Sequence, residues 1–198
     1  MTFGIRRRAL LLAPLTLSLA IWGHASDWPQ LLGPSHDGVY PEHDLASSWP
    51  PQGPAVLWQG VVGQGFSGPA ILDGKLVIFH RLGDKEVVEC LDCAQGKPLW
   101  HFEYPTAYRD DFGFDEGPRA TPTIAAGKVY TLGAEGAFHC LDLQTGAKLW
   151  SFPTSGRVGS SPAVANGVVY VGSEDGYVYA IGRRTPRRRG RLRLRNPR

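Results

Sequence analysis

The stretch CLDCAQGKPLW at residues 90–100 decides the fold, because it returns as CLDLQTGAKLW at residues 140–150. The two copies share Cys, Leu, Asp, Gly, Leu and Trp in register, at an offset of 50 residues. A second, Pro-initiated pattern precedes each copy and occurs three times, at residues 69–77, 122–130 and 162–170. Self-similarity at periods of about 40 to 53 residues predicts a repeat architecture.

The pattern of each repeat predicts short strands joined by tight turns. A Pro opens the first strand, where a missing backbone donor is tolerated. The pairs at 73–74, 126–127 and 166–167 end in Gly and predict hairpin turns. Second and third strands follow, and an Asp-to-Gly turn leads to a fourth strand that carries the Trp. The recurring residues of this blade motif are Asp92, Gly96, Trp100, Asp142, Gly146 and Trp150.

Four antiparallel strands per repeat predict an all-β fold, a β-propeller with blades at about 66–103, 119–153 and 157–182. Only three strands are expected in the last blade, and residues 55–58 resemble an outer strand without its inner three. The prediction is about two and three-quarter blades plus one N-terminal closing strand. Closed propellers have roughly 4–8 blades, so residues 26–182 predict an incomplete ring.

Charge is unevenly distributed along the sequence. The 21 Lys and Arg and 18 Asp and Glu give a net charge of +3, but 12 of the Arg lie in residues 1–8 and 183–198. Residues 9–182 therefore carry a net charge of −9. This acidic body excludes a basic nucleic-acid-binding domain, and 42% apolar residues exclude a disordered chain.

The two ends are predicted to lie outside the propeller. Residues 1–25 have a basic start, a short apolar run and a small-residue end, which predict a cleaved signal peptide and a periplasmic or secreted protein without a stable membrane anchor. The Arg-rich residues 183–198 begin where the blade motif fails, and we expect them to be disordered. Our hypothesis is that this change of composition reflects a truncated or frame-shifted reading of a longer propeller. A basic tail for anionic lipid or polymer is the alternative.

The three cysteines are best explained as small buried apolar residues. Cys90 and Cys93 have the spacing of a redox or metal motif, but the following Ala94 excludes haem attachment and no second ligand pair appears. Along one strand their Cα atoms would lie about 10 Å apart, beyond the reach of a disulfide.

The pattern Asp-x-x-x-Gly-x-x-Leu-Trp resembles the tryptophan-docking motif of pyrroloquinoline-quinone-like (PQQ-like) β-propellers, and residues 27–39 resemble the start of exported bacterial members. The resemblance covers residues 27–181. It implies the fold and two functions: a binding scaffold, or a quinoprotein dehydrogenase that uses pyrroloquinoline quinone and Ca²⁺. The adjacent Cys pair of the family enzymes is absent here, and no base or metal-ligand set can be placed.

The insertion at residues 108–119 is the most distinctive segment outside the repeat. Its carboxylates are Asp110, Asp111, Asp115 and Glu116, and together they could offer oxygen ligands to Ca²⁺. The alternative is a connector held by pairs between Arg119 and these carboxylates and by Phe rings.

The sequence favours an exported, non-catalytic repeat protein that acts as a binding or assembly scaffold for a protein or polymer. A fragment of a PQQ-dependent alcohol or sugar dehydrogenase is the alternative. Nucleic acid is not an expected partner, and the open blade edges predict self-association.

Overall fold

The computed structural model describes residues 26–40, 46–182 and 188–193. The predicted signal peptide and parts of the Arg-rich segment lie outside these ranges. Twelve strands in the described residues form three antiparallel sheets of four strands each. No helix in the described residues is long and apolar enough to cross a membrane. The all-β prediction is confirmed.

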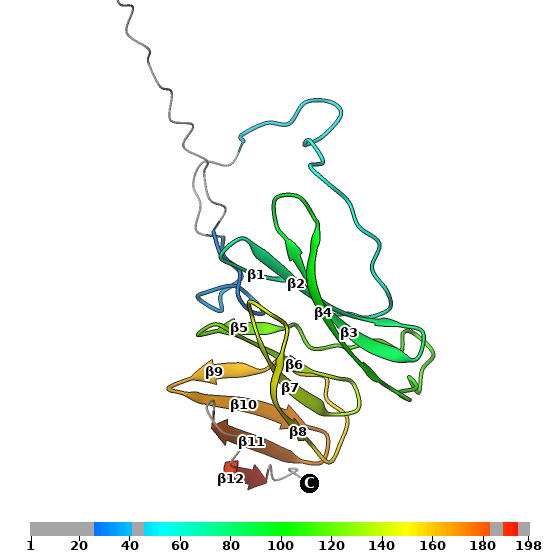
Figure 1. Cartoon of the computed structure of the whole chain (residues 1–198), viewed down its shortest axis with the longest axis vertical. Coiled ribbons are helices and arrows are strands. Elements are labelled where there is room, and N and C mark those ends of the chain that lie inside the picture. Colours follow the sequence, from blue (N-terminus) through cyan, green and yellow to red (C-terminus); the bar gives the residue numbers. More distant parts are fainter. Residues whose placement is uncertain (1–25, 41–45, 183–187, 194–198) are drawn as a thin grey trace, which may run out of the picture.

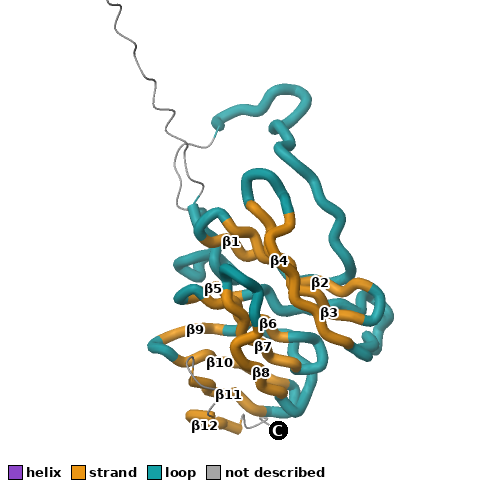
Figure 2. The backbone as a smooth tube through the Cα atoms, viewed as in Figure 1, coloured by secondary structure: helices purple, strands orange, loops and turns teal. Residues whose placement is uncertain are grey.

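Within each sheet the strands follow the order of the chain, and the three sheets fan out one after another (Figures 1 and 2). We call the sheets the first, second and third blade. The first blade contains β1 (Ala70–Leu72), β2 (Lys75–Leu82), β3 (Lys85–Asp92) and β4 (Pro98–Pro105). The second contains β5 (Thr123–Ala125), β6 (Lys128–Leu132), β7 (Ala137–Asp142) and β8 (Lys148–Pro153). The third contains β9 (Ala163–Ala165), β10 (Val168–Ser173), β11 (Tyr177–Gly182) and β12 (Arg188–Arg193).

The third blade corrects the prediction of a three-stranded unit followed by a disordered tail. Strand β12 pairs with β11 from Tyr177 opposite Arg193 to Ile181 opposite Arg188. Pairing uses backbone groups, so the open edge of β11 accepts a strand whose composition carries no apolar signal. A register irregularity also recurs at one equivalent place in all three blades, after Cys90, Cys140 and Ala180.

The predicted N-terminal strand at residues 55–58 does not form. These residues have no strand assignment, and the only bridge in residues 55–67 joins Gln64 to Arg81. An isolated segment has no neighbouring backbone to complete a ladder, which explains the error. In Figure 1 this segment runs as a long cyan loop along the outside of the first blade.

The core lies between blades rather than within one. We call the side of a blade that faces the next blade its forward face, and the opposite side its backward face. Between the first two blades, one buried cluster joins the forward face of the first to the backward face of the second: Val77, Phe79, Val88 and Cys90 pack with Ile124, Val129, Leu141 and Leu143. Between the second and third blades, the same positions supply Tyr130, Leu132, Phe138 and Cys140 against Val169, Val171, Tyr179 and Ile181.

Hydroxyl groups link the innermost strands. The backbone N–H of Gly68, before β1, donates to Thr121 Oγ1 at 3.2 Å. The backbone N–H of Thr121, before β5, donates to Ser161 Oγ at 2.9 Å. These residues occupy one repeat position, immediately before the strand-opening Pro, so the same short link is used twice. Residues 28–29 lie beside β1 and β5, through hydrogen bonds of Trp28 with Ile71 and of Ile124 with Pro29.

Candidate functional site

The blade-motif residues form a turn on which a tryptophan of the preceding blade lies. The Asp142 carboxylate accepts hydrogen bonds from the hydroxyl and backbone N–H of Thr145 and from the N–H of Gln144, and these bonds lower its pKa. Gly146 has a φ of +71°, and a Cβ there would lie 2.6 Å from the Trp100 ring. The Trp100 indole N–H donates to Leu143 O at 2.9 Å. These contacts give the motif a packing role.

Trp58 makes the same contact with the first blade, although it belongs to no strand. Its indole N–H donates to Cys93 O at 2.9 Å, and a Cβ at Gly96 would lie 2.6 Å from its ring. In this turn the Asp92 carboxylate accepts from the N–H of Gln95. Residues 55–62 therefore occupy the position of an outer strand that precedes the first blade. Val61 is 98% exposed and Leu57 is 84% exposed, so this segment presents apolar side chains to solvent.

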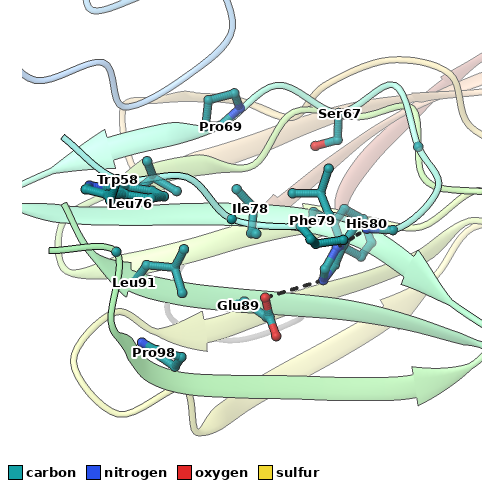
Figure 3. A pocket seen from close by; sticks show the side chains of 16 residues that line it. Trp58, Ser67, Pro69, Leu76, Ile78, Phe79, His80, Glu89, Leu91 and Pro98 are labelled. Atoms are coloured by element: carbon teal, nitrogen blue, oxygen red, sulfur yellow. Dashed lines mark hydrogen bonds and ion pairs between the residues drawn. The ribbon is translucent and has the colours of Figure 1, made fainter. Parts of the chain in front are cut away.

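A cavity of about 440 Å³ lies between this segment and the backward face of the first blade. Its lining includes Leu76, Ile78 and Leu91 of the first blade, together with Trp58 and residues 60–63. Figure 3 shows Trp58 beside Leu76. The lining is mainly apolar. Its polar side chains include His80 and Glu89, which face each other from β2 and β3 (Figure 3).

His80 has a defined tautomer in this cavity. Its Nδ1 accepts the backbone N–H of Gly63 at 2.8 Å, so the neutral ring carries its proton on Nε2. Nε2 lies 3.6 Å from the Glu89 carboxylate, beyond hydrogen-bond distance. Burial lowers the pKa of His80, and Glu89 opposes that shift. The cavity therefore presents one hydrogen-bond donor, the Nε2–H of His80, and one carboxylate, Glu89, within a mainly apolar lining.

The four carboxylates of the 108–119 insertion do not converge on a common point. Asp110 accepts from the N–H of Phe114 and Phe112 and pairs with Arg119 at 2.5 Å, and the Phe114 bond makes the largest contribution to lowering its pKa. The other three carboxylates have separate partners: Asp111 pairs with Arg157, Asp115 accepts from the N–H of Gly117, and Glu116 pairs with Arg109 and Arg81.

No group of three or more His, Cys, Asp or Glu side chains in the described ranges is arranged to hold a metal ion. The Ca²⁺ site therefore stays a prediction without a ligand set. The expected pair between Arg119 and a carboxylate is present, with Asp110. The Arg119 guanidinium also lies over the Phe66 ring, with its Cζ 5.1 Å from the ring centroid. Phe112 and Phe114 do not pack the insertion against the blades. They stack on each other and are 81% and 79% exposed.

Arg81 is a buried cation that the sequence analysis missed. Its guanidinium donates to the backbone oxygens of Gly83, Tyr108 and Glu116, at 2.7–3.0 Å. Arg81 thereby fixes the insertion to the end of β2. The residue resembles any strand Arg in the sequence, and only the folded insertion surrounds it with acceptors.

A second missed feature is a polar cluster between the first two blades. The buried Glu86 carboxyl accepts the N–H of Ala134 at 2.9 Å, and desolvation raises its pKa despite the neighbouring Tyr104 hydroxyl. The His139 ring lies 4.4 Å from the Tyr104 ring, and neither of its nitrogens has a hydrogen-bond partner among the described residues. Burial lowers the pKa of His139 to about 4. Glu86 and His139 lie in strands with runs of buried residues, and no sequence motif distinguishes these two positions.

The prediction of buried cysteines is confirmed for Cys90 and Cys140 but not for Cys93, which is partly exposed. Cys90, Cys93 and Cys140 are free thiols, and Cys90 and Cys140 are buried at equivalent positions of the forward faces. Burial raises the pKa of each of these two to about 11, which disfavours the reactive thiolate.

A sequence profile described as outer membrane protein assembly factor BamB, the PQQ_2 family, matches residues 84–189, more than half of the chain. The chain belongs to this family. The BamB protein of Shewanella oneidensis is 30% identical over 136 residues, 64% of this chain and 34% of that protein. The 1-butanol dehydrogenase (cytochrome c) of Thauera butanivorans is 34% identical over 89 residues, 39% of this chain and 13% of that protein.

Among solved structures, a europium-containing methanol dehydrogenase superposes with a TM-score of 0.55 at 21% identity, over 70% of this chain and 26% of that one. This likeness supports the propeller fold alone. The chain spans about a third of the length of the Shewanella protein and a smaller share of the Thauera enzyme. The relatives include both an outer membrane protein assembly factor and a dehydrogenase, so these likenesses do not choose between the two functions.

Proposed function

We propose that this chain is an exported, non-catalytic scaffold that binds a protein partner through the first blade and the segment at residues 55–62. The observation that carries the proposal is the position of that segment. Trp58 anchors it beside the first blade, while its backbone has no strand partner in the described residues and Val61 and Leu57 face solvent. An anchored, unpaired, apolar segment is suited to accept a strand from another chain.

The described carboxylates of the insertion do not form a ligand set for the Ca²⁺ that accompanies such a quinone. The carboxylates of the insertion are engaged by Arg side chains and backbone N–H groups, and no ligand trio is present in the part of the chain that the structure describes. The likeness to a 1-butanol dehydrogenase keeps the dehydrogenase fragment as the competing proposal. Absorbance titration with pyrroloquinoline quinone and Ca²⁺ separates the two: saturable binding would overturn the non-catalytic proposal.

Site-directed photo-crosslinking tests the binding surface in the cell that makes the protein. A benzoylphenylalanine placed at Val61 is expected to give a discrete cross-linked product, identified by mass spectrometry. The control position is Ser151, an exposed residue of β8. Equal labelling from both positions, or none from Val61, would contradict the proposed surface.

We also propose that Trp58 and Trp100 act as tryptophan-docking residues and that residues 1–25 direct export. The indole bonds to Cys93 and Leu143 support the first point, and the basic-then-apolar sequence supports the second. Sequencing the N-terminus of the mature protein tests export. The expected first residue is Ser26, and a retained Met1 would contradict cleavage.

A further inference from the structure

The insertion at residues 108–119 carries an exposed aromatic pair. Phe112 and Phe114 are 81% and 79% exposed, and their rings stack with centroids 6.2 Å apart and an interplanar angle of 28°. Neither ring belongs to an interblade cluster. The two rings therefore add nothing to the described core, and side by side they present one apolar surface to solvent.

The backbone beneath the pair is held from inside the insertion. The Asp110 carboxylate accepts the N–H groups of Phe112 and Phe114 at 3.2 and 2.9 Å. Gly113, between the two rings, has a φ of +72° and donates its N–H to Asp110 O at 3.3 Å. Arg119 in turn pairs with the Asp110 carboxylate. The rings are thus carried by a hydrogen-bonded turn.

Residues on both sides of the insertion hold it in position. Arg81, at the end of β2, donates to the backbone oxygens of Tyr108 and Glu116. Arg157, between β8 and β9, pairs with Asp111, and its Cζ lies 5.3 Å from the Tyr108 ring centroid. Described residues therefore flank the insertion on both sides. A binding partner would not have to order this segment, which lowers the entropic cost of association.

The surface around the pair is acidic. The hairpins β2–β3, β6–β7 and β10–β11 turn on the same side of the fan as the insertion (Figure 1). We call residues 81–85, 106–119, 133–136, 154–157 and 174–176 together the loop surface. It contains eight Asp and Glu and five Lys and Arg, a net charge of −3.

The charges of the loop surface that remain without an ion pair are carboxylates. All five of its cations form ion pairs: Arg81, Lys85, Arg109, Arg119 and Arg157. By contrast, Asp84, Glu135 and Glu174 are exposed and form no ion pair within the ranges that the structure describes. Two of them adjoin Thr106, which donates its N–H to Asp84 O at 2.9 Å and its hydroxyl to Glu135 at 2.8 Å. Uncompensated negative charge therefore lies beside the insertion.

We propose that the loop surface binds a basic, partly apolar segment of a partner protein, with Phe112 and Phe114 as the anchor. A lysine or arginine fits both features, because an aromatic face attracts a cation and the nearby carboxylates complement its charge. An apolar residue beside that cation covers the remaining ring surface. Aromatic anchors within a polar rim are the usual energetic centre of a protein interface.

This surface is separate from the segment at residues 55–62. Trp58 contacts the turn between β3 and β4, at Cys93 and Gly96, whereas the loop surface contains the turn at the other end of β3. The two surfaces can therefore be altered independently, and neither proposal rests on the other.

Fluorescence anisotropy with labelled peptides tests the chemistry of the partner. The probe is the peptide GKLGKLGKLG, compared with GELGELGELG, in which the charge is reversed, and GKSGKSGKSG, which lacks apolar residues. We expect saturable binding of the Lys–Leu peptide, about tenfold or more tighter than that of either other peptide. Raising NaCl from about 50 to about 500 mM should weaken it severalfold. Equal binding of the acidic peptide, or no saturable binding of the Lys–Leu peptide up to about 1 mM, would overturn the proposal.

Removal of the rings tests the anchor. Phe112→Ser combined with Phe114→Ser should weaken binding of the Lys–Leu peptide about tenfold or more. Its urea midpoint should stay unchanged, because both rings are exposed. The matched control is Leu99→Ser, an apolar residue of β4 that is 49% exposed and lies outside the loop surface. Unchanged affinity in the double variant, or an equal loss in Leu99→Ser, would refute the anchor.

Neutralisation of the rim tests the role of charge. Asp84→Asn, Glu135→Gln and Glu174→Gln together keep the hydrogen-bond acceptors and remove three negative charges. This variant should bind the Lys–Leu peptide severalfold more weakly and with a smaller salt dependence. An unchanged affinity and salt dependence would contradict the basic character of the partner.

One further variant separates this surface from the segment at residues 55–62. Leu57→Ser combined with Val61→Ser alters only that segment and should leave peptide binding unchanged. If this variant loses the peptide while the double Phe variant keeps it, the loop surface is not the binding site and the segment is. Retained binding in this variant, with loss in the double Phe variant, is the result we expect.

Discussion

The boundary between the first and second blades and the boundary between the second and third share one geometry but differ in polarity. Phe102 meets His139 edge to face at 5.1 Å in the first, and Phe152 meets Tyr179 edge to face at 5.6 Å in the second. The Tyr179 hydroxyl donates to Asp175, whereas the His139 nitrogens lack partners among the described residues. The same repeat position thus holds a tyrosine whose hydroxyl is hydrogen-bonded in one blade and a histidine whose nitrogens are not in the other.

The repeat therefore specifies where aromatic rings meet, while the polarity of each boundary depends on residues that do not recur. The first boundary also buries Glu86, and at the second boundary its position is Gly136. Burying a polar group without full compensation costs stability, so the first boundary should be the weaker and the more sensitive to pH.

The largest expected effect is at the apolar boundary. Phe138→Ala removes a fully buried ring between the second and third blades and should lower the free energy of unfolding by about 3–5 kcal/mol. The matched control is Val88→Ala, the same position in the first blade, which removes a smaller volume. Urea denaturation measures both. Equal losses would contradict the idea that the second boundary depends more on aromatic packing.

Acid should weaken the first boundary through His139. Its folded-state pKa of about 4 lies below the ordinary value of 6.5, so the unfolded chain binds more protons between these pH values. The contribution of neutral His139 to the free energy of unfolding is therefore fully present above pH 6.5. It falls by up to about 3 kcal/mol as the pH drops to 4. In His139→Phe the acid loss should shrink. His101→Phe, at an exposed histidine, is the control, and a similar change in both variants would refute the assignment.

Glu86 should have the opposite pH dependence. Its pKa is raised by desolvation, so the folded protein binds more protons above pH 4.5, and stability falls as the pH rises through the folded-state pKa. Glu86→Gln keeps an acceptor for the Ala134 N–H and removes the buried charge. We expect a gain of about 1 kcal/mol at pH 8 and little change at pH 4. Thermal unfolding at the two pH values measures it, and a uniform loss would contradict the account.

The smallest expected effect concerns the indole bonds. Trp100→Phe keeps a ring on the turn but removes the donor to Leu143 O, and should cost about 1 kcal/mol. Trp58→Phe makes the same change at the first blade and should cost a similar amount, measured by urea denaturation. A negligible loss at Trp58 alone would mean that residues 55–62 are not anchored as an outer strand would be.

The sequence predicted the elements that recur and missed those that occur once. Hairpin turns, strand order and the buried Cys90 and Cys140 follow from a pattern repeated every 40 to 53 residues. Strand β12 was missed because backbone pairing leaves no trace in an Arg-rich composition. Residues 55–58 were assigned as a strand from their apolar pattern, but the pattern cannot supply the neighbouring strand they need.

The candidate site was harder to predict than the fold. The carboxylates of the insertion were visible in the sequence, but their Arg partners come from positions as distant as Arg81 and Arg157. The polar pair in the cavity, His80 and Glu89, and the buried Glu86 and His139 depend on which face of a strand meets which neighbour. That information is in the packing of blades, and single-strand periodicity does not contain it.

The two hydroxyl links at the innermost strands have a consequence for curvature. Thr121 and Ser161 hold neighbouring blades at the reach of a single β-hydroxyl, with contacts of 3.2 and 2.9 Å. Neighbouring blades are therefore joined at their innermost strands by one short side chain, and the first two are also joined at the outermost strand by the Trp100 indole. We expect a longer residue at the innermost strand to change the angle between neighbouring blades, and thereby the curvature of the fan.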